Sequence, residues 1–352
     1  MNDRGSRLQT PNAERAGEAG PRDVSAAEAN ARRRLNARLR QPYPAAMAVP
    51  PLLFVTGKGG VGKSTLTAAL AQRLARQGRR VLAVEMAGDG SLAALFGQGA
   101  LPTEPASLST RLDGVRIETR ALVESYFRRL LRLPFLSRRL FASGTFHAVT
   151  AAAPGVTEFV VLDHLAQWTA TGWLGRRAAY DNVIVDGPAS GHALRLLRAP
   201  RQLGALVPRG PLASTMNRLA TLLDNHAHTG VLLVAIPEDL AVSETLETRA
   251  ALDQLGVRLT RPVLNRVWPR RFSVADIEAV SALRARRDEP LLAAAALEIG
   301  ARREAERHLG RLRRAFGSPP LPLPELCRGG VDAAGVAAMG RSLERAFGGH
   351  GA

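Results

Sequence analysis

A glycine-rich loop that carries two lysines is the part of the sequence best suited to chemistry. Residues 57–64 read GKGGVGKS and fit the pattern G-x-x-x-x-G-K-[ST]. In this pattern backbone N–H groups surround phosphate oxygens, the lysine Lys63 reaches the β- and γ-phosphates, and the hydroxyl of Ser64 binds Mg²⁺. The loop therefore predicts a site for ATP and Mg²⁺. Its predicted nucleotide-binding residues are Gly57, Lys58, Gly59, Gly60, Val61, Gly62, Lys63, Ser64 and Thr65.

The use of lysine in the chain supports this interpretation. The 352 residues include 48 Lys plus Arg, yet the two lysines, Lys58 and Lys63, both lie in this loop, and every other basic residue is arginine. A lysine ammonium is a compact point charge on a flexible stem, whereas a guanidinium is planar and rigid. Lysine is thus found at the two positions where a compact, flexible ammonium group is needed, in a chain that otherwise uses arginine.

The elements that flank the loop are those that a phosphate-binding loop requires. An apolar strand is predicted over 52–56, and leucine and alanine spacing predicts a helix over 64–75 that ends at Gly78. Further runs of Val, Leu and Ile are typical of parallel strands buried on both faces. We predict an α/β fold, namely a three-layer P-loop NTPase with a mostly parallel sheet and an inserted helical subdomain.

Three later segments, in the order in which they follow the loop, are typical of one family of ATPases. Residues 180–197 contain a strand that ends at Asp186, residues 231–245 read as a strand, a Pro-Glu turn and a helix, and residues 261–267 form a strand with Asn265. With the second lysine, Lys58, which makes the loop a deviant P-loop, the chain resembles the arsenical-pump (ArsA) ATPase family over residues 50–345. This family is related to the tail-anchored-protein targeting ATPases and, more distantly, to the MinD and ParA ATPases.

The resemblance implies a mechanism and a set of site residues. It implies a Mg-ATP-dependent ATPase that works as a homodimer, or as a heterodimer with a paralogue, in which Lys58 reaches the partner's nucleotide. It also implies that Asp186 holds Mg²⁺ together with Ser64 and that Asn265 hydrogen-bonds the adenine. A segment containing Pro322 and Leu323 is expected to pack on the base.

One departure from the family concerns the attacking water. After the second strand the family carries an Asp that positions this water, whereas counting from the flanking strand and from Leu92 places Ala87 there. We predict that Asp89 takes over this role, with Glu85 a weaker substitute, and that hydrolysis is slow. Lys58, Lys63, Asp89 and Asp186 are the predicted catalytic residues. The loss of the family Asp leaves a second possibility open, a nucleotide-gated binding protein with negligible hydrolysis.

The segment over residues 101–173 is predicted to be a helical insert. It alternates apolar residues with arginine pairs. In the relatives, helices at this place form a client-binding subdomain that opens and closes with nucleotide. We predict such a surface for an unknown client or partner protein, and a helical cap that packs on its own sheet or dimer partner is the alternative.

The ends of the chain differ in composition from the ATPase domain expected over 47–345. Residues 1–46 are rich in Ala, Arg, Asn and Glu without apolar periodicity, and we predict a disordered tail, or a start of translation at Met47. Residues 346–352 are expected to be a flexible end.

Charge and cysteine content limit the remaining functions. The formal net charge is +17, but the arginines are spread along the chain and aromatic residues make up only 5%, so we predict no specific nucleic-acid binding. A MinD- or ParA-like positioning ATPase stays an alternative. The lone cysteine, Cys327, cannot build a thiolate metal site. Low cysteine use suits a reducing cytoplasm, and without a run of about 18 apolar residues the chain is not expected to be an integral membrane protein.

Overall fold

The computed structural model describes residues 49–86, 90–131, 155–169, 178–206, 209–283, 289–326 and 333–347, all within the unit Pro42–Ala352. The strands are β1 (Leu52–Thr56), β2 (Val81–Glu85), β3 (Ala106–Ser109), β4 (Leu112–Arg116), β5 (Asn182–Asp186), β6 (Thr229–Ala235), β7 (Val263–Val267) and β8 (Leu321–Pro324). The helices are α2 (Lys63–Arg76), α3 (Ser91–Leu95), α4 (Thr119–Leu131), α7 (Val156–Thr169), α8 (Ser190–Leu206), α9 (Pro211–Asp224), α10 (Asp239–Gln254), α11 (Val274–Ala282), α12 (Pro290–Phe316) and α13 (Ala333–Phe347).

The strands form one sheet in the order β3-β4-β2-β5-β1-β6-β7-β8. All neighbouring pairs run parallel except β3 with β4, which are antiparallel and carry a register irregularity between Ser107 and Ser109. β1 lies between β5 and β6, and the chain moves to opposite sides of β1 to form β2 and β6. At such a point the carboxyl ends of the strands open a crevice, which is where ligands bind in α/β sheets.

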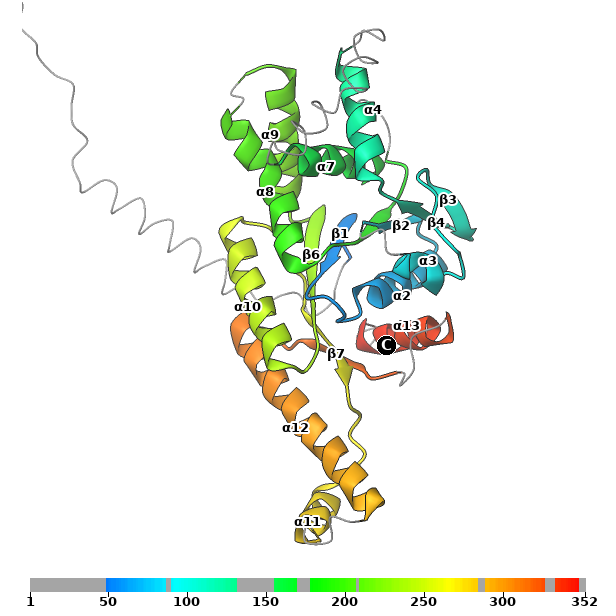
Figure 1. Cartoon of the computed structure of the whole chain (residues 1–352), viewed down its shortest axis with the longest axis vertical. Coiled ribbons are helices and arrows are strands. Elements are labelled where there is room, and N and C mark those ends of the chain that lie inside the picture. The colour runs from blue at the N-terminus through cyan, green and yellow to red at the C-terminus, as the bar shows by residue number, and fades with distance from the viewer. Residues whose placement is uncertain are drawn as a thin grey trace, which may run out of the picture. The chain divides into compact units, whose positions relative to one another are not determined.

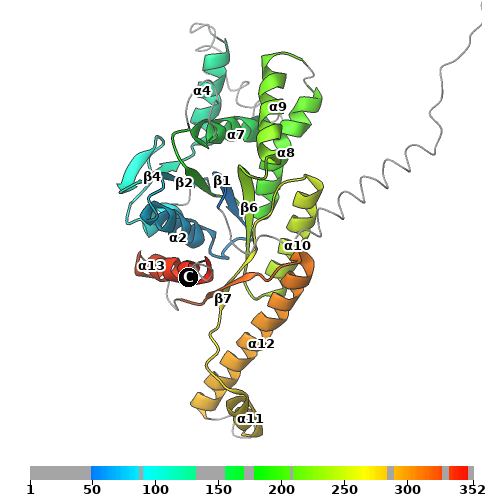
Figure 2. The same cartoon turned by 180° about the vertical axis from the view of Figure 1, so that it is seen from behind.

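Helices cover both faces of the sheet, as the continuous apolar strands require (Figures 1 and 2). On one face α2 and α13 bury Leu66, Leu70 and Met339 against the sheet. On the other face α7, α8, α9, α10 and α12 share a second core with residues such as Phe159 and Phe316. The prediction of a three-layer α/β P-loop NTPase fold is confirmed.

The boundaries of the elements near the loop agree closely with the sequence. β1 covers the predicted residues 52–56, and α2 ends at Arg76, with Gly78 just beyond it at a φ of 85° that favours glycine. β2 extends to Glu85, one residue further than the apolar run Val81–Val84, because the Glu85 side chain is fully buried at the strand end.

The segment predicted as a helical insert contains strands in its first part. Residues 106–116 form β3 and β4, and β4 pairs with β2 along its whole length. These strands are difficult to recognise from the sequence, because β3 lies at the edge of the sheet and three of its four residues are exposed. Helical structure begins with α4, and α7 follows after residues that lie outside the described part. Tyr126 of α4 packs edge-on against Phe159 of α7, with 5.6 Å between the ring centroids.

Both termini of the chain lie outside the described residues. This applies to the predicted tail 1–46, to Met47 and to residues 348–352, while α13 continues to Phe347, past the predicted domain end at 345. Among the helices that the structure describes, none combines the length and the apolar character needed to span a bilayer.

Candidate functional site

The phosphate loop connects β1 to α2, as a P-loop must. Gly57 has a φ of 154°, and a Cβ atom on it would lie 2.2 Å from the carbonyl oxygen of Val234 in β6. Gly62, the N-cap of α2, has a φ of 94°, and a Cβ there would lie 2.4 Å from Nδ2 of Asn265. Both positions therefore require glycine. The loop ends at the N-terminus of α2, whose free N–H groups and dipole favour an anion.

The two lysines of the loop have different surroundings. Lys63 curls back over the loop, and its Nζ donates hydrogen bonds to the carbonyl oxygens of Gly57 at 3.2 Å and Lys58 at 3.0 Å. The ammonium group is thereby held above the loop, where phosphate oxygens are expected to lie. The half-buried Lys58 side chain makes no hydrogen bond or ion pair with any residue that the structure describes.

A hydroxyl pair follows the loop. Oγ of Ser64 lies 2.9 Å from Oγ of Ser91, the first residue of α3. The next N–H group, that of Leu92, donates to Oε1 of Glu85 at 3.2 Å. Ser91 was not predicted as a site residue, because its contact with Ser64 joins segments 27 residues apart and no local pattern shows it. Glu85 and Ser91 are thus held in place on the two sides of residues 87–89, which lie outside the described part of the chain.

Asp186 lies where the sequence predicted it, at the carboxyl end of β5. It is 2% exposed and is paired in register with Val55 of β1 on one side and Glu85 of β2 on the other. The turn that follows is tied to β1, because Gly187 N donates to Val55 O at 2.9 Å and the Thr56 hydroxyl donates to Pro188 O at 2.8 Å. The Asp186 turn and the phosphate loop thus leave adjacent strands, and hydrogen bonds tie the Asp186 turn to the end of β1.

Asn265 on β7 contacts the phosphate loop directly. Its Nδ2 donates to Val61 O at 2.9 Å, while Oδ1 is buried and accepts no hydrogen bond from the described residues. The next residue, Arg266, has a φ of 57°, and the pairing of β7 with β8 shifts register here. A bulge of this kind re-aims side chains. It directs Asn265 toward the loop and leaves one acceptor atom for a ligand.

The other predicted residues vary in position. Thr65 is buried in the first turn of α2, and Gly59 and Gly60 are exposed at the tip of the loop. Pro322 and Leu323 lie on β8, where Leu323 is fully buried in the core beside α13 and Pro322 is exposed. Their contact with the base stays a prediction. Asp89, Ala87 and Cys327 lie outside the described residues.

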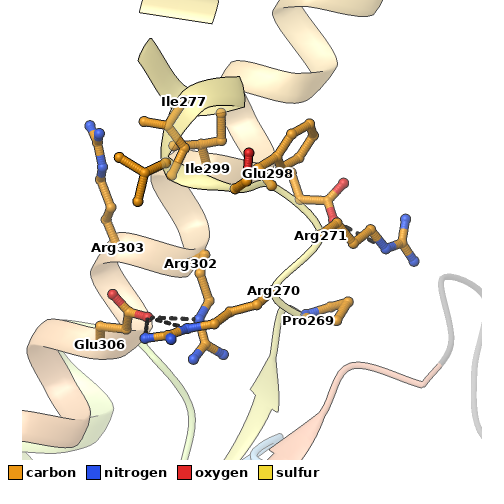
Figure 3. A pocket seen from close by; sticks show the side chains of 12 residues that line it. Pro269, Arg270, Arg271, Ile277, Glu298, Ile299, Arg302, Arg303 and Glu306 are labelled. Carbon is orange, nitrogen blue, oxygen red and sulfur yellow. Dashed lines mark hydrogen bonds and ion pairs between the residues drawn. The ribbon is translucent and has the colours of Figure 1, made fainter. Parts of the chain in front are cut away.

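A second hollow, of about 400 Å³, lies between the loop after β7, α11 and α12 (Figure 3). Two of the arginines that line it are paired with glutamates: Arg270 with Glu306 at 2.6 Å, and Arg271 with Glu298 at 3.4 Å. The predicted site residues are not among those that line it. Its lining residues are Pro269, Arg270, Arg271, Phe272, Ser273, Val274, Ile277, Glu298, Ile299, Arg302, Arg303 and Glu306.

The sheet order, the strand–loop–helix unit and the lysine folded over the loop define a P-loop nucleotide-binding protein. Residues 51–211 match the family of anion-transporting ATPases, ArsA. Curated relatives agree. ATPase BagA of Mycobacterium tuberculosis is 29% identical over 240 residues, 67% of this chain and 70% of that protein. Residues 51–211 of the chain are thus similar to the ArsA family of ATPases, which confirms the resemblance predicted from the sequence.

Two further similar proteins are named as arsenical pump-driving ATPases. The arsenical pump-driving ATPase of Escherichia coli is 28% identical over 250 residues, 66% of this chain but 42% of that protein. The putative arsenical pump-driving ATPase 2 of Aquifex aeolicus is 26% identical over 247 residues, 62% of this chain and 80% of the relative. The family supports a nucleotide-dependent, ATP-hydrolysing enzyme.

Proposed function

We propose that the protein is a Mg-ATP-dependent ATPase in which two copies of the chain join around the nucleotides, and in which Lys58 of one copy acts on the nucleotide of the other. The observation that carries this proposal is the contrast between the two lysines. Lys63 is held over its own loop by two backbone carbonyls, while the Lys58 side chain has no partner in the described part of its own chain.

The donor atoms around the loop fit Mg²⁺. The Ser64 hydroxyl and the Asp186 carboxylate supply the hard oxygen ligands that this ion prefers. They come from the two turns that leave the adjacent strands β1 and β5. Bound Mg²⁺ would offset the charge of the β- and γ-phosphates.

The chain's own groups account for the rest of the proposed mechanism. Loop N–H groups and Lys63 hold the phosphates and stabilise negative charge as the terminal phosphate leaves. Lys58 adds a second positive charge from the partner copy, comparable to an arginine finger. The acceptor Oδ1 of Asn265 suits the amino group of adenine. Asp89 is proposed to orient the attacking water, and its position two residues after Ala87 supports slow turnover.

We further propose that nucleotide turnover changes the surface formed by α4 and α7. The Thr56–Pro188 hydrogen bond and the short Asp186 turn connect β1 to α8, which packs against α7. This path gives the phosphate loop a physical route to the helices where the relatives bind clients. The client remains unidentified, and the cytoplasmic location inferred from cysteine content stays a prediction.

Mixing two inactive variants tests the assignment of Lys58. Steady-state phosphate release is measured for Lys58→Ala, for Lys63→Ala and for an equal mixture of the two. If Lys58 acts across a dimer, each mixed dimer contains one complete site, so the mixture recovers about a quarter of wild-type turnover. No recovery above the separate variants, in a mixture that sedimentation shows to contain dimers with ATP, would contradict action in trans.

A second candidate function rests on Ala87, which stands where the family Asp is expected. In this case the protein binds ATP and changes conformation but does not hydrolyse it. ATP binding by the wild type, with phosphate release no higher than that of Lys63→Ala, would favour this gated binder over an ATPase. An Asp89→Asn variant that matches wild-type turnover would remove Asp89 from the mechanism of an active enzyme.

A further inference from the structure

A histidine that the proposed ATPase mechanism does not use is buried between α10 and α12. His308 of α12 is 0% exposed, and neither of its ring nitrogens makes a hydrogen bond with a described residue. Burial lowers the pKa of His308, and this effect outweighs the opposing effect of the carboxylates of Asp239 and Glu304. A neutral imidazole has one donor and one acceptor nitrogen, and burying both without partners is unfavourable.

Two carboxylates face this imidazole. Nε2 of His308 lies 3.9 Å from Oδ1 of Asp239, the first residue of α10, and 3.7 Å from Oε1 of Glu304. Glu304 and His308 are four residues apart on α12, so both point from the same face of the helix. One ligand atom from each of the three residues lies within 4.8 Å of the other two.

These spacings are close to those of a coordinated metal ion. Metal bonds to imidazole nitrogen and carboxylate oxygen are about 2.0–2.2 Å long, which places the ligand atoms of a tetrahedral ion about 3.3–3.6 Å apart. Small rotations of the Asp239 and Glu304 side chains would suffice, and both can move because they are 69% and 45% exposed.

Two arginines of α12 now neutralise the carboxylates. Arg311 donates to Asp239 Oδ1 at 2.7 Å, and Arg307 lies 3.0 Å from Glu304 and 3.6 Å from Asp239. Ion pairs at exposed positions of this kind are weak, because water screens them and mobile side chains must be ordered. A divalent cation would displace them from the oxygen atoms that face His308.

We propose that Asp239, Glu304 and His308 bind a divalent transition-metal ion of the Zn²⁺ type between α10 and α12. An imidazole with two carboxylates suits such ions better than Mg²⁺, which prefers oxygen ligands alone. With three protein ligands, water completes the coordination. The ion fastens the first turn of α10 to α12. This site is separate from the phosphate loop and does not depend on the proposed ATPase mechanism.

Metal titration of the full-length protein tests the proposal. The chain is stripped with a chelator, and without nucleotide Zn²⁺ binding is followed by calorimetry and Co²⁺ binding by visible absorption. We expect one saturable ion per chain, with binding weakened at least about tenfold by Asp239→Asn and by Glu304→Gln and more by His308→Ala. Arg311→Gln should tighten binding, because it removes the competing donor on Asp239.

Two control variants separate this site from background binding. Glu306→Gln removes a nearby α12 carboxylate that belongs to the Arg270 pair, and His226→Ala removes an exposed imidazole, so neither should change the affinity. The proposal fails if no saturable binding occurs, or if Asp239→Asn and Glu304→Gln bind as tightly as the wild type. Asp239 and Glu304 are exposed, so their variants are expected to fold and to test the proposal even if His308→Ala does not fold.

Discussion

The phosphate loop and the α11–α12 arm, residues 269–306, are stabilised in different ways. At the loop the backbone itself approaches neighbouring strands, so that Gly57 has no space for a Cβ atom against Val234 O. In the arm no residue of α11 is buried, and Val274 and Leu291 are 73% and 81% exposed. Ion pairs such as Arg270–Glu306 (Figure 3) support it instead. A capping box of Ser273 and Asp276 also stabilises the start of α11. Substitutions should therefore be costly at the loop and mild in the arm.

The largest expected effect is on catalysis at the loop. Lys63→Ala should lower phosphate release by about 10²–10³-fold, because the charge held over the loop stabilises the transition state. The matched change in the arm, Arg303→Ala, also removes one positive charge and should leave turnover unaltered. A large loss of turnover in Arg303→Ala would show that the arm takes part in the reaction.

A second comparison lies within α12, which runs from the arm into the core. Leu312 is 0% exposed and Leu297 is 76% exposed. Leu312→Ala should destabilise the fold by about 2–5 kcal/mol through lost burial and a cavity. Leu297→Ala should change stability by no more than about 0.5 kcal/mol. Urea unfolding of both variants measures the difference, and similar midpoints would mean that the exposed half of α12 is covered in solution.

Gly57→Ala tests the close approach at the loop. Steric overlap and the positive φ should cost about 1–3 kcal/mol in the nucleotide-free protein. Gly59 is the natural control, because a Cβ there meets no atom within 4 Å and its φ is not in the left-handed region. Gly59→Ala should stay within about 1 kcal/mol of the wild type. Equal unfolding midpoints for the two variants would refute the steric argument.

The smallest effect is expected at the Arg270–Glu306 pair. The hydrogen bond from Arg270 holds the pKa of Glu306 below its usual value. Its contribution is therefore present above the usual carboxyl pKa and is lost as the pH falls below it. Since Glu306 is 40% exposed, Glu306→Gln should cost at most about 1 kcal/mol at neutral pH. Unfolding at pH 7 and pH 3 should show the variant and wild type converging in acid.

Local patterns predicted the loop and the strands around it because their physics is local. A glycine-rich turn between an apolar strand and a helix predicts a phosphate loop. Asp186 follows a continuous run of Val and Ile, which predicts a buried strand. The contact of Ser64 with Ser91 and the grouping of Asp239 with His308 could not be found in this way. Ser91 meets Ser64, and Asp239 meets His308, only through tertiary packing across distant segments.

The helical insert shows a related limit. Residues 106–116 were predicted as helical, yet they complete one side of the sheet as β3 and β4. β3 is paired on one side only and three of its four residues are exposed, while β4, paired on both sides, carries Asp113 and Gly114 in its middle, so neither strand shows a continuous apolar run. Helical structure begins only at Thr119, after β4. No local pattern shows that β4 pairs with β2, so the start of the helical part could not be predicted.

The prolines of β8 bear on how copies of this protein can associate. Leu321 N–H donates inward to Pro262 O, and the alternation of the strand turns Pro322 and Pro324 outward, where they present no N–H group. The opposite edge, β3, is short and irregular. Neither border of the sheet thus offers an even row of donors to a foreign strand. The edges of the described sheet are therefore poorly suited to edge-to-edge pairing, which favours association through other surfaces.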